Sequence, residues 1–278
     1  MIGEKYGIMQ LAMDLRRLAA DYPFVEVGTI GCSVLGQPLY ALRIGSGPFR
    51  WHFNGSCHGN EWITTPLLVK FAYDYAFAAC TRGTVGGMDA HNLLRRNTLW
   101  IVPMLNPDGV EWVLQGLASS DWKANARGVD LNDQFPAYWE EERQRRQVQL
   151  PGPRDYGGPA PLSEPEARAL ADWTVRMDFH AVLSLHTQGE EVYWNYRDYE
   201  PPCSQEWAGR LADAAGYRAV ALTGSDAGYK DWFLQAFRRP GFTVEAGSGV
   251  NPLPAGDFPA ISQRLNRLFA QALDLSPP

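Results

Sequence analysis

The chain has 278 residues, 45% of them hydrophobic and 20% charged, with 31 acidic against 25 basic side chains and a formal net charge of −6. This acidic balance, without any Lys/Arg run, argues against nucleic acid and anionic membranes as partners. No apolar stretch reaches the about 18 residues that a membrane-spanning helix needs. Since no linker or internal repeat divides the chain, we expect a single domain over residues 1–278.

The four cysteines are widely spaced and form no Cys-x-x-Cys pair: Cys32, Cys57, Cys80 and Cys203. This spacing is neither a disulfide framework nor a structural zinc site, so a reduced cytoplasmic setting is the simpler interpretation. The alternative is a spore or cell wall location, if an N-terminal module or signal is missing from this sequence. Cys57 beside His58 raises the question of a thiol nucleophile, but such a thiol needs a dedicated base, and the motifs below indicate a metal.

Hydrophobic periodicity predicts strands that alternate with helices, which is typical of an α/β sheet with helices on both faces. In the first half we expect an amphipathic helix within residues 1–23, a hairpin of strands 24–31 and 38–44, a strand at 48–54, a helix at 63–79 and a buried strand at 97–105. In the second half we expect a helix that begins near residue 163, a strand at 179–185, helices at 207–215 and 230–237, a strand at 242–244 and a closing helix at 261–273.

Three connecting segments carry local signals of their own. Asn106–Gly109 (Asn-Pro-Asp-Gly) predicts a turn after the strand 97–105. Residues 117–161 are polar and rich in Pro and Gly, so we interpret them mainly as an extended surface loop, which at this length is usually functional. Ser163 is expected to cap the helix that follows it, with Glu166 completing a capping box.

Polar side chains follow three of the predicted strands. His58 and Glu61 stand on a glycine-containing turn after the strand 48–54, and His186 and Glu245 end the strands near 185 and 244. Ligands bind at this edge of an open α/β sheet, and catalytic zinc takes three N/O ligands with one open position. Alone, His58-x-x-Glu61 is a weak signal that also fits a polar loop residue and a helix N-terminal glutamate. The four residues together favour a metal site.

In its motifs the sequence resembles the zinc carboxypeptidase family. The matching segments fall in the family's order and approximate spacing: His58–Glu61, Asn106–Gly109, Gly128–Asn132, Ser184–His186 and Thr243–Glu245. The resemblance implies that His58, Glu61 and His186 bind one Zn²⁺ per chain and that Glu245 is the general base. It also implies a three-layer α/β/α domain around a mixed, mostly parallel sheet of about eight strands. Cobalt or manganese would also suit this ligand set in vitro.

The cation that would stabilise the oxyanion has two candidates. In the family it is an arginine one residue after a Trp, in the loop before the Gly-Val-Asp segment. Here Trp122 is followed by Lys123, whereas counting back from Gly128 favours Arg127. Both residues stay open, beside the alternative of solvated basic side chains on a loop.

Two departures from the family bear on the substrate. A typical exopeptidase of the family has Asn-Arg where this chain has Asn132-Asp133, and that arginine grips the free C-terminal carboxylate. An acid there removes the grip and adds repulsion. The stretch 132–136 instead resembles the branch that cleaves γ-D-glutamyl bonds to diaminopimelate in bacterial wall peptides.

The specificity pocket gives a second set of expectations. Counting back from Glu245 puts Lys230 at the pocket floor, where it would attract an acidic side chain such as that of diaminopimelate. Asp226 or Asp133 would then meet the ammonium group of the diamino acid. The same count puts Thr223 where the family often has a mobile tyrosine, with Tyr229 as its candidate substitute.

Three functions follow, in order of preference. The first is a zinc metallopeptidase that hydrolyses the γ-D-glutamyl-meso-diaminopimelate bond of peptidoglycan peptides, which would be its partners. The second is a zinc-dependent acylase of N-acyl amino acids, and the third is a non-catalytic module that binds peptidoglycan fragments. Intact His58, Glu61, His186 and Glu245 speak against the third. The sequence leaves the oligomeric state open.

Overall fold

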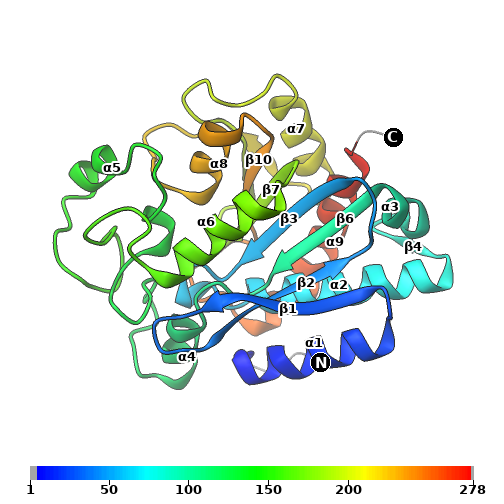
Figure 1. Ribbon diagram of the computed structural model, residues 1–278, viewed down its shortest axis with the longest axis horizontal. Helices are drawn as coiled ribbons and strands as arrows, with labels where there is room; N and C mark the ends of the chain where they lie inside the picture. Colours follow the sequence, from blue (N-terminus) through cyan, green and yellow to red (C-terminus); the bar gives the residue numbers. More distant parts are fainter. Residues whose placement is uncertain (1–4, 277–278) are drawn as a thin grey trace.

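The computed structural model describes residues 5–276, within which eight strands form one sheet in the order β1-β2-β6-β3-β7-β10-β8-β9 (Figure 1). The strands are β1 (Val25–Cys32), β2 (Pro38–Ile44), β3 (Phe49–Gly55), β6 (Asn97–Val102), β7 (Ala181–His186), β8 (Glu191–Tyr193), β9 (Arg218–Val220) and β10 (Gly241–Glu245). The central four strands β6, β3, β7 and β10 run parallel, while β2 and β8 join them antiparallel on either side. The prediction of a mixed sheet of about eight strands is confirmed.

Helices cover both faces of the sheet, as expected. The main helices are α1 (Ile8–Asp21), α2 (Thr64–Thr81), α3 (Ala90–Arg96), α4 (Pro107–Gln115), α5 (Trp139–Arg146), α6 (Pro165–Met177), α7 (Ser204–Ala215), α8 (Tyr229–Phe237) and α9 (Phe258–Asp274). Figure 1 shows α6 and α8 in front of the sheet, with α2 and α9 behind it. None of the helices within residues 5–276 is long and apolar enough to cross a membrane.

Two hydrophobic cores lie between these layers. Along β7, whose six residues are all buried, Leu183 packs into the core shared with α2 and α9, and Val182 packs into the core shared with α6 and α8. Burial on both faces accounts for the largely apolar sequences of β6 and β7. That residues 1–278 form one domain stays a prediction.

Several predicted elements are confirmed near their expected bounds: the hairpin β1–β2, the strands β3, β7 and β10, and the helices α2, α7, α8 and α9. The N-terminal helix is confirmed as α1, and residues 1–4 of its predicted range lie outside the described residues. The strand predicted at 97–105 ends earlier, at Val102. The sequence did not reveal the short strands β4 (Thr84–Val85) and β5 (Met88–Asp89), nor α3, β8 and β9.

Asn106–Gly109 is the start of a helix rather than an isolated turn. Asn106 is the N-cap of α4, and its side-chain oxygen accepts a hydrogen bond from the amide of Gly109 at 3.0 Å. Pro107 occupies the first helical position, where its missing N–H costs nothing. The same residues that predict a turn therefore begin α4.

The capping box predicted for α6 is wrong. The residue before the helix is Glu164, which makes no side-chain cap. Ser163 donates its hydroxyl to Gln134, and Glu166 accepts the backbone amide of Val34 at 3.0 Å. These side chains connect α6 to distant loops and do not accept hydrogen bonds from the free backbone N–H groups of its first turn.

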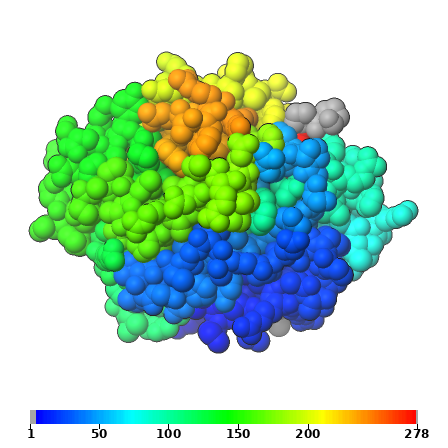
Figure 2. All heavy atoms as spheres, in the orientation of Figure 1, coloured from blue at the N-terminus to red at the C-terminus, as the bar shows by residue number. Residues whose placement is uncertain are grey.

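The segment 117–161 is a packed part of the protein rather than mainly an extended surface loop. It contains the 3₁₀ turn η2 (Leu131–Asp133) and α5, and the side chains of Leu131 and Phe135 are fully buried. In the space-filling view, this green part of the chain makes up the left flank of the face shown (Figure 2). Its proximity to the strand ends places its charged side chains near the candidate site.

Candidate metal centre

The carboxyl ends of three neighbouring strands build the candidate site. His186 ends β7 and Glu245 ends β10, and the two residues lie side by side in the parallel register. His58 follows β3, and Glu61 ends the short 3₁₀ turn η1 (Gly59–Glu61) before α2. The four predicted residues thus meet at one edge of the sheet.

The turn that carries His58 is held by backbone contacts that only a glycine allows. The amide of Gly59 donates to the carbonyl of Lys123 at 3.0 Å. A Cβ atom at position 59 would lie 2.7 Å from the backbone of Gly109, so a larger residue would push the segments apart. The side-chain amide of Asn106 donates to the carbonyls of Cys57 and Lys123, each at 3.1 Å. The Asn-Pro-Asp-Gly motif therefore joins the turn to the loop that bears Lys123.

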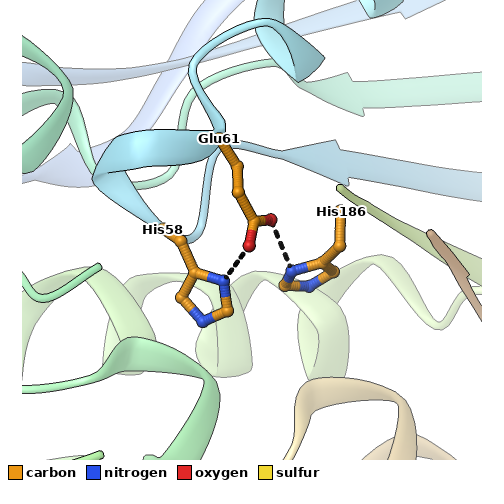
Figure 3. Close-up of side chains that lie close together, drawn as sticks. All are labelled: His58, Glu61 and His186. Atoms are coloured by element: carbon orange, nitrogen blue, oxygen red, sulfur yellow. Dashed lines mark hydrogen bonds and ion pairs between the residues drawn. The ribbon is translucent and has the colours of Figure 1, made fainter. Parts of the chain in front are cut away.

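The carboxylate of Glu61 lies between the two imidazole rings (Figure 3). His58 Nδ1 is 2.7 Å from Glu61 Oε1, and His186 Nδ1 is 3.0 Å from Glu61 Oε2. All three side chains are buried, and one donor atom from each lies within 4.8 Å of the others. Two imidazole nitrogens and a carboxylate oxygen that converge in this way match the ligand set of a catalytic zinc.

Asp130 contacts the ring nitrogen of His58 that does not face Glu61. Its Oδ1 accepts His58 Nε2 at 3.1 Å, which leaves Nδ1 as the nitrogen that faces Glu61. A carboxylate behind a ligating histidine is the usual means of fixing its tautomer and ring orientation. Burial lowers the pKa of His58, but Glu61 and Asp130 outweigh it and raise the pKa to about 9. Burial instead outweighs Glu61 at His186 and lowers the pKa of that imidazole.

The comparisons with known proteins agree with this geometry. A profile of the zinc carboxypeptidase family matches residues 11–249. The gamma-D-glutamyl-L-diamino acid endopeptidase 1 of Lysinibacillus sphaericus is 44% identical over 98% of this chain and 73% of its own length. The chain belongs to the zinc carboxypeptidase family. It is a zinc metallopeptidase, and His58, Glu61 and His186 are its candidate zinc ligands.

Solved structures agree on the fold. Carboxypeptidase A from Helicoverpa armigera superposes with a TM-score of 0.77 at 20% identity, over 96% of this chain and 72% of that one. Murein-tripeptide amidase MpaA from Escherichia coli O157 gives a TM-score of 0.59 at 24% identity, over 90% and 92% of the two chains. At these identities the similarity establishes that this zinc carboxypeptidase shares their fold, and it does not extend to substrate or residue roles.

A cavity of about 460 Å³ opens over the metal centre of this zinc carboxypeptidase. Besides the candidate ligands and Glu245, it is lined by Asn60, Asp121, Lys123, Asp130, Asn132, Asp133, Arg146, Arg154, Asp155, Thr187, Gln188, Tyr193, Thr243, Gly249, Val250 and Asn251. Removal of Glu245 from water, together with the nearby charge of Glu61, raises the pKa of Glu245 to about 8. A cation at the candidate ligands would oppose this shift.

Of the two candidate oxyanion cations, the cavity contains Lys123. Its Nζ lies 3.9 Å from Glu61 Oε1. Arg127 is outside the cavity lining, and its guanidinium lies 3.6 Å from Glu164 with more than half of its side chain exposed. Lys123 therefore lies in the cavity beside the candidate ligands, and Arg127 does not line it.

The residues expected at the specificity pocket divide into two groups. Asn132 and Asp133 line the cavity, but Lys230 and Asp226 do not. The ammonium of Lys230 donates to the carbonyl of Asn195 at 2.7 Å and pairs with Asp231 at 2.6 Å, and only 5% of Lys230 is exposed. Placing Lys230 at the pocket floor is therefore a mistake of the sequence count, because its charge is already matched inside the protein.

Asp226, Thr223 and Tyr229 also lie outside the lining of this cavity. Asp226 accepts hydrogen bonds from Tyr196 and two arginines, and Thr223 lines a separate pocket of about 240 Å³. The phenol of Tyr229 is buried in the core and bonds to Thr174 at 2.8 Å. Tyr229 therefore does not replace the family's mobile tyrosine.

Sequence reasoning missed several cavity residues, among them Asp130, Arg146, Arg154 and Tyr193. Asp130 was within a recognised motif, Gly128–Asn132, but its bond to His58 was not visible in the sequence. Tyr193 pairs in register with Thr243 across β8 and β10, and β8 was not predicted. Arg146 and Arg154 belong to the segment 117–161, whose folding no local signal indicated.

Proposed function

We propose that this metallopeptidase hydrolyses the γ-D-glutamyl-meso-diaminopimelate bond of peptidoglycan peptides. The observation that carries the proposal is the 44% identity, over 98% of the chain, to a protein named for γ-D-glutamyl-L-diamino acid cleavage. At this identity, over nearly the whole chain, a shared reaction is the simplest interpretation.

The cavity supports this substrate class. Its charged lining includes Lys123, Arg146 and Arg154 together with Asp121, Asp133 and Asp155. A wall peptide of this type carries both free carboxylates and an ammonium group, which such a mixed lining can match. Asp133 stands where an exopeptidase of the family would hold a C-terminal carboxylate directly, so an ordinary C-terminal trimming reaction is disfavoured.

The proposed chemistry assigns a role to each central side chain. His58, Glu61 and His186 would hold the zinc ion, which would supply a Lewis acid to acidify water and polarise the scissile carbonyl. A carboxylate oxygen of Glu245 accepts a proton from the attacking water and returns it to the leaving nitrogen. Lys123 offers its positive charge to the oxygen on which negative charge develops.

The test is mass spectrometry of products after incubation with L-Ala-γ-D-Glu-meso-diaminopimelate. The expected result is release of free diaminopimelate, together with loss of release in Glu245→Gln. The matched control is the same peptide with an ordinary α-linked glutamate, which should stay intact. No cleavage of the γ-linked peptide would overturn the proposal, and hydrolysis of N-acetyl amino acids in its place would favour an acylase.

We further propose a reduced, cytoplasmic setting and peptidoglycan-derived peptides as partners. All four cysteines are free: Cys32, Cys57, Cys80 and Cys203. Free thiols at exposed positions such as Cys32 and Cys80 suit a reducing compartment. Fractionation of cells that express the protein, followed by immunoblotting, tests this setting, and recovery in the wall fraction would contradict it.

A further inference from the structure

Arg146 is a cavity residue that the proposed chemistry leaves without a role. It ends α5, 36% of its side chain is exposed, and its guanidinium lines the same cavity as the candidate zinc ligands. Asp133, on η2, is 2% exposed and receives this guanidinium, with Arg146 Nε at 3.1 Å from Oδ2 and Nη2 at 3.3 Å from Oδ1. Where the family has an arginine on η2, this chain has an acid that holds an arginine brought by another helix.

Ion pairs hold the guanidinium of Arg146 in place, but they do not occupy all of its N–H donors. Its Nε also lies 2.7 Å from Glu142, and its Nη1 lies 3.1 Å from Asp155. A guanidinium has five N–H donors, and the hydrogen bonds to Asp155 and Asp133 engage one on each terminal nitrogen. Each terminal nitrogen of Arg146 therefore keeps a second N–H that can donate to a carboxylate.

The position of α5 is fixed by the neighbouring arginine. Arg145 pairs with Asp226 and Glu142 and donates to the carbonyl of Gly224 at 2.7 Å. This contact ties the end of α5 to the loop before α8. A guanidinium held in place before binding loses little freedom when an anion arrives.

Arg146 lies among carboxylates that other groups share. Asp133, Glu142 and Asp155 contact Arg145, Arg146 and Arg154, and Arg145 also pairs with Asp226. Asp130, in the same acidic cluster as Asp133 and Asp155, accepts a hydrogen bond from His58. Arg146 itself lines the cavity with about a third of its side chain exposed.

We propose that Arg146 is a specificity-determining residue that binds a carboxylate of the leaving diamino acid, in place of an arginine at position 133. This inference rests on the proposed function for the identity of the substrate. The leaving residue is the part of the peptide expected beside position 133. Diaminopimelate offers two carboxylates, one on its main chain and one at the end of its side chain, and the experiment separates them.

The experiment compares three peptides on the zinc-loaded enzyme. The first is L-Ala-γ-D-Glu-meso-diaminopimelate, the second carries L-Lys in place of diaminopimelate, and the third carries a main-chain carboxamide on diaminopimelate. In Arg146→Gln, kcat/KM should fall about 10-fold or more, mainly through KM, on the peptides that have the bound carboxylate. The peptide that lacks it should be spared, and its identity tells which carboxylate Arg146 binds.

Two further variants separate recognition from structural damage. Asp133→Asn combined with Arg146→Gln removes both partners, so no unpaired buried carboxylate remains, and it should show the same change in preference. Arg143→Gln is the matched control, because Arg143 lies on α5, pairs with Glu140 at 3.2 Å and is outside the cavity lining. Equal losses on all three peptides, or no loss on any of them, would overturn the proposal.

A binding measurement gives a readout that needs no turnover. By calorimetry, free meso-diaminopimelate should bind the zinc-loaded protein about 10-fold more tightly than it binds Arg146→Gln, and as tightly as it binds Arg143→Gln. Equal binding to all three proteins, or no binding to any, would refute the role of Arg146. If the γ-linked peptides are not cleaved at all, the proposed function fails, and this titration still decides the proposal for Arg146.

Discussion

At the scale of single residues, Glu245 and Asp130 adjoin different candidate ligands of the metal centre. Glu245 lies beside His186 in the sheet register, whereas Asp130 holds the far nitrogen of His58. The first should affect turnover and the second should affect metal binding, so single substitutions can separate the two roles.

We expect Glu245→Gln to lower kcat by about 10²- to 10⁴-fold, because the amide cannot accept the proton of the attacking water. Zinc content, measured by atomic absorption, should stay near one per chain. Glu26→Gln is the matched control, since Glu26 lies on β1, pairs with Arg43 and is outside the cavity lining. Full activity of the Glu245 variant would rule out its role as general base.

Asp130→Asn should weaken zinc binding about 10- to 100-fold, because the bond that orients His58 loses its charge. Competition with a chromophoric chelator measures the affinity. Asp121→Asn is a suitable comparison, since Asp121 lines the cavity but is not part of the metal cluster. An unchanged zinc affinity in the Asp130 variant would show that His58 needs no such support.

At the scale of elements, α8 carries a buried ion pair in its first turn rather than a substrate contact. Lys230 and Asp231 are each about 95% buried, and Lys230 also bonds to the carbonyl of Asn195. We expect Lys230→Met to lower the free energy of unfolding by about 3–5 kcal/mol, because it leaves Asp231 buried without its partner. Urea denaturation monitored by fluorescence measures the loss.

The same variant should keep the wild-type ratio of kcat/KM between peptides with diaminopimelate and with lysine. A changed ratio of kcat/KM with an unchanged free energy of unfolding would show that Lys230 does belong to the specificity pocket. Lys70→Met is the control for loss of a lysine, since the Lys70–Asp74 pair on α2 is half exposed and should contribute little.

The elements also show what the sequence alone can predict. The buried strands and their polar ends were predictable, because short stretches rich in apolar residues and followed by polar or glycine residues identify β3, β7 and β10, and His58, His186 and Glu245 follow or end them. The placements of Asp130 and Arg146 were not, since each depends on a contact between segments far apart or on α5, whose charged sequence has no apolar periodicity. The prediction for Lys230 differs from the structure for a related reason. Counting along the chain gives the place of a residue in the sequence motif but not the direction of its side chain.

At the scale of the whole molecule, the metal centre joins parts of the chain that only the folded sheet brings together. Glu61 and His186 are 125 residues apart in sequence and 3.0 Å apart at their donor atoms. An unfolded chain has no such arrangement, so zinc should bind the native state far more tightly and stabilise it by mass action.

We therefore expect removal of zinc to lower the melting temperature of the protein and zinc addition to restore it. At free zinc of about 100 times Kd the gain is about 2.7 kcal/mol. At about 2–4 °C per kcal/mol for a domain of roughly this size, the shift is about 5–10 °C. Scanning calorimetry of chelator-treated protein, with and without zinc, measures it without any substrate. His186→Ala should abolish most of the shift, whereas His91→Ala, at an exposed position on α3, should keep it. A full shift in the His186 variant would mean that zinc stabilises the protein from another site.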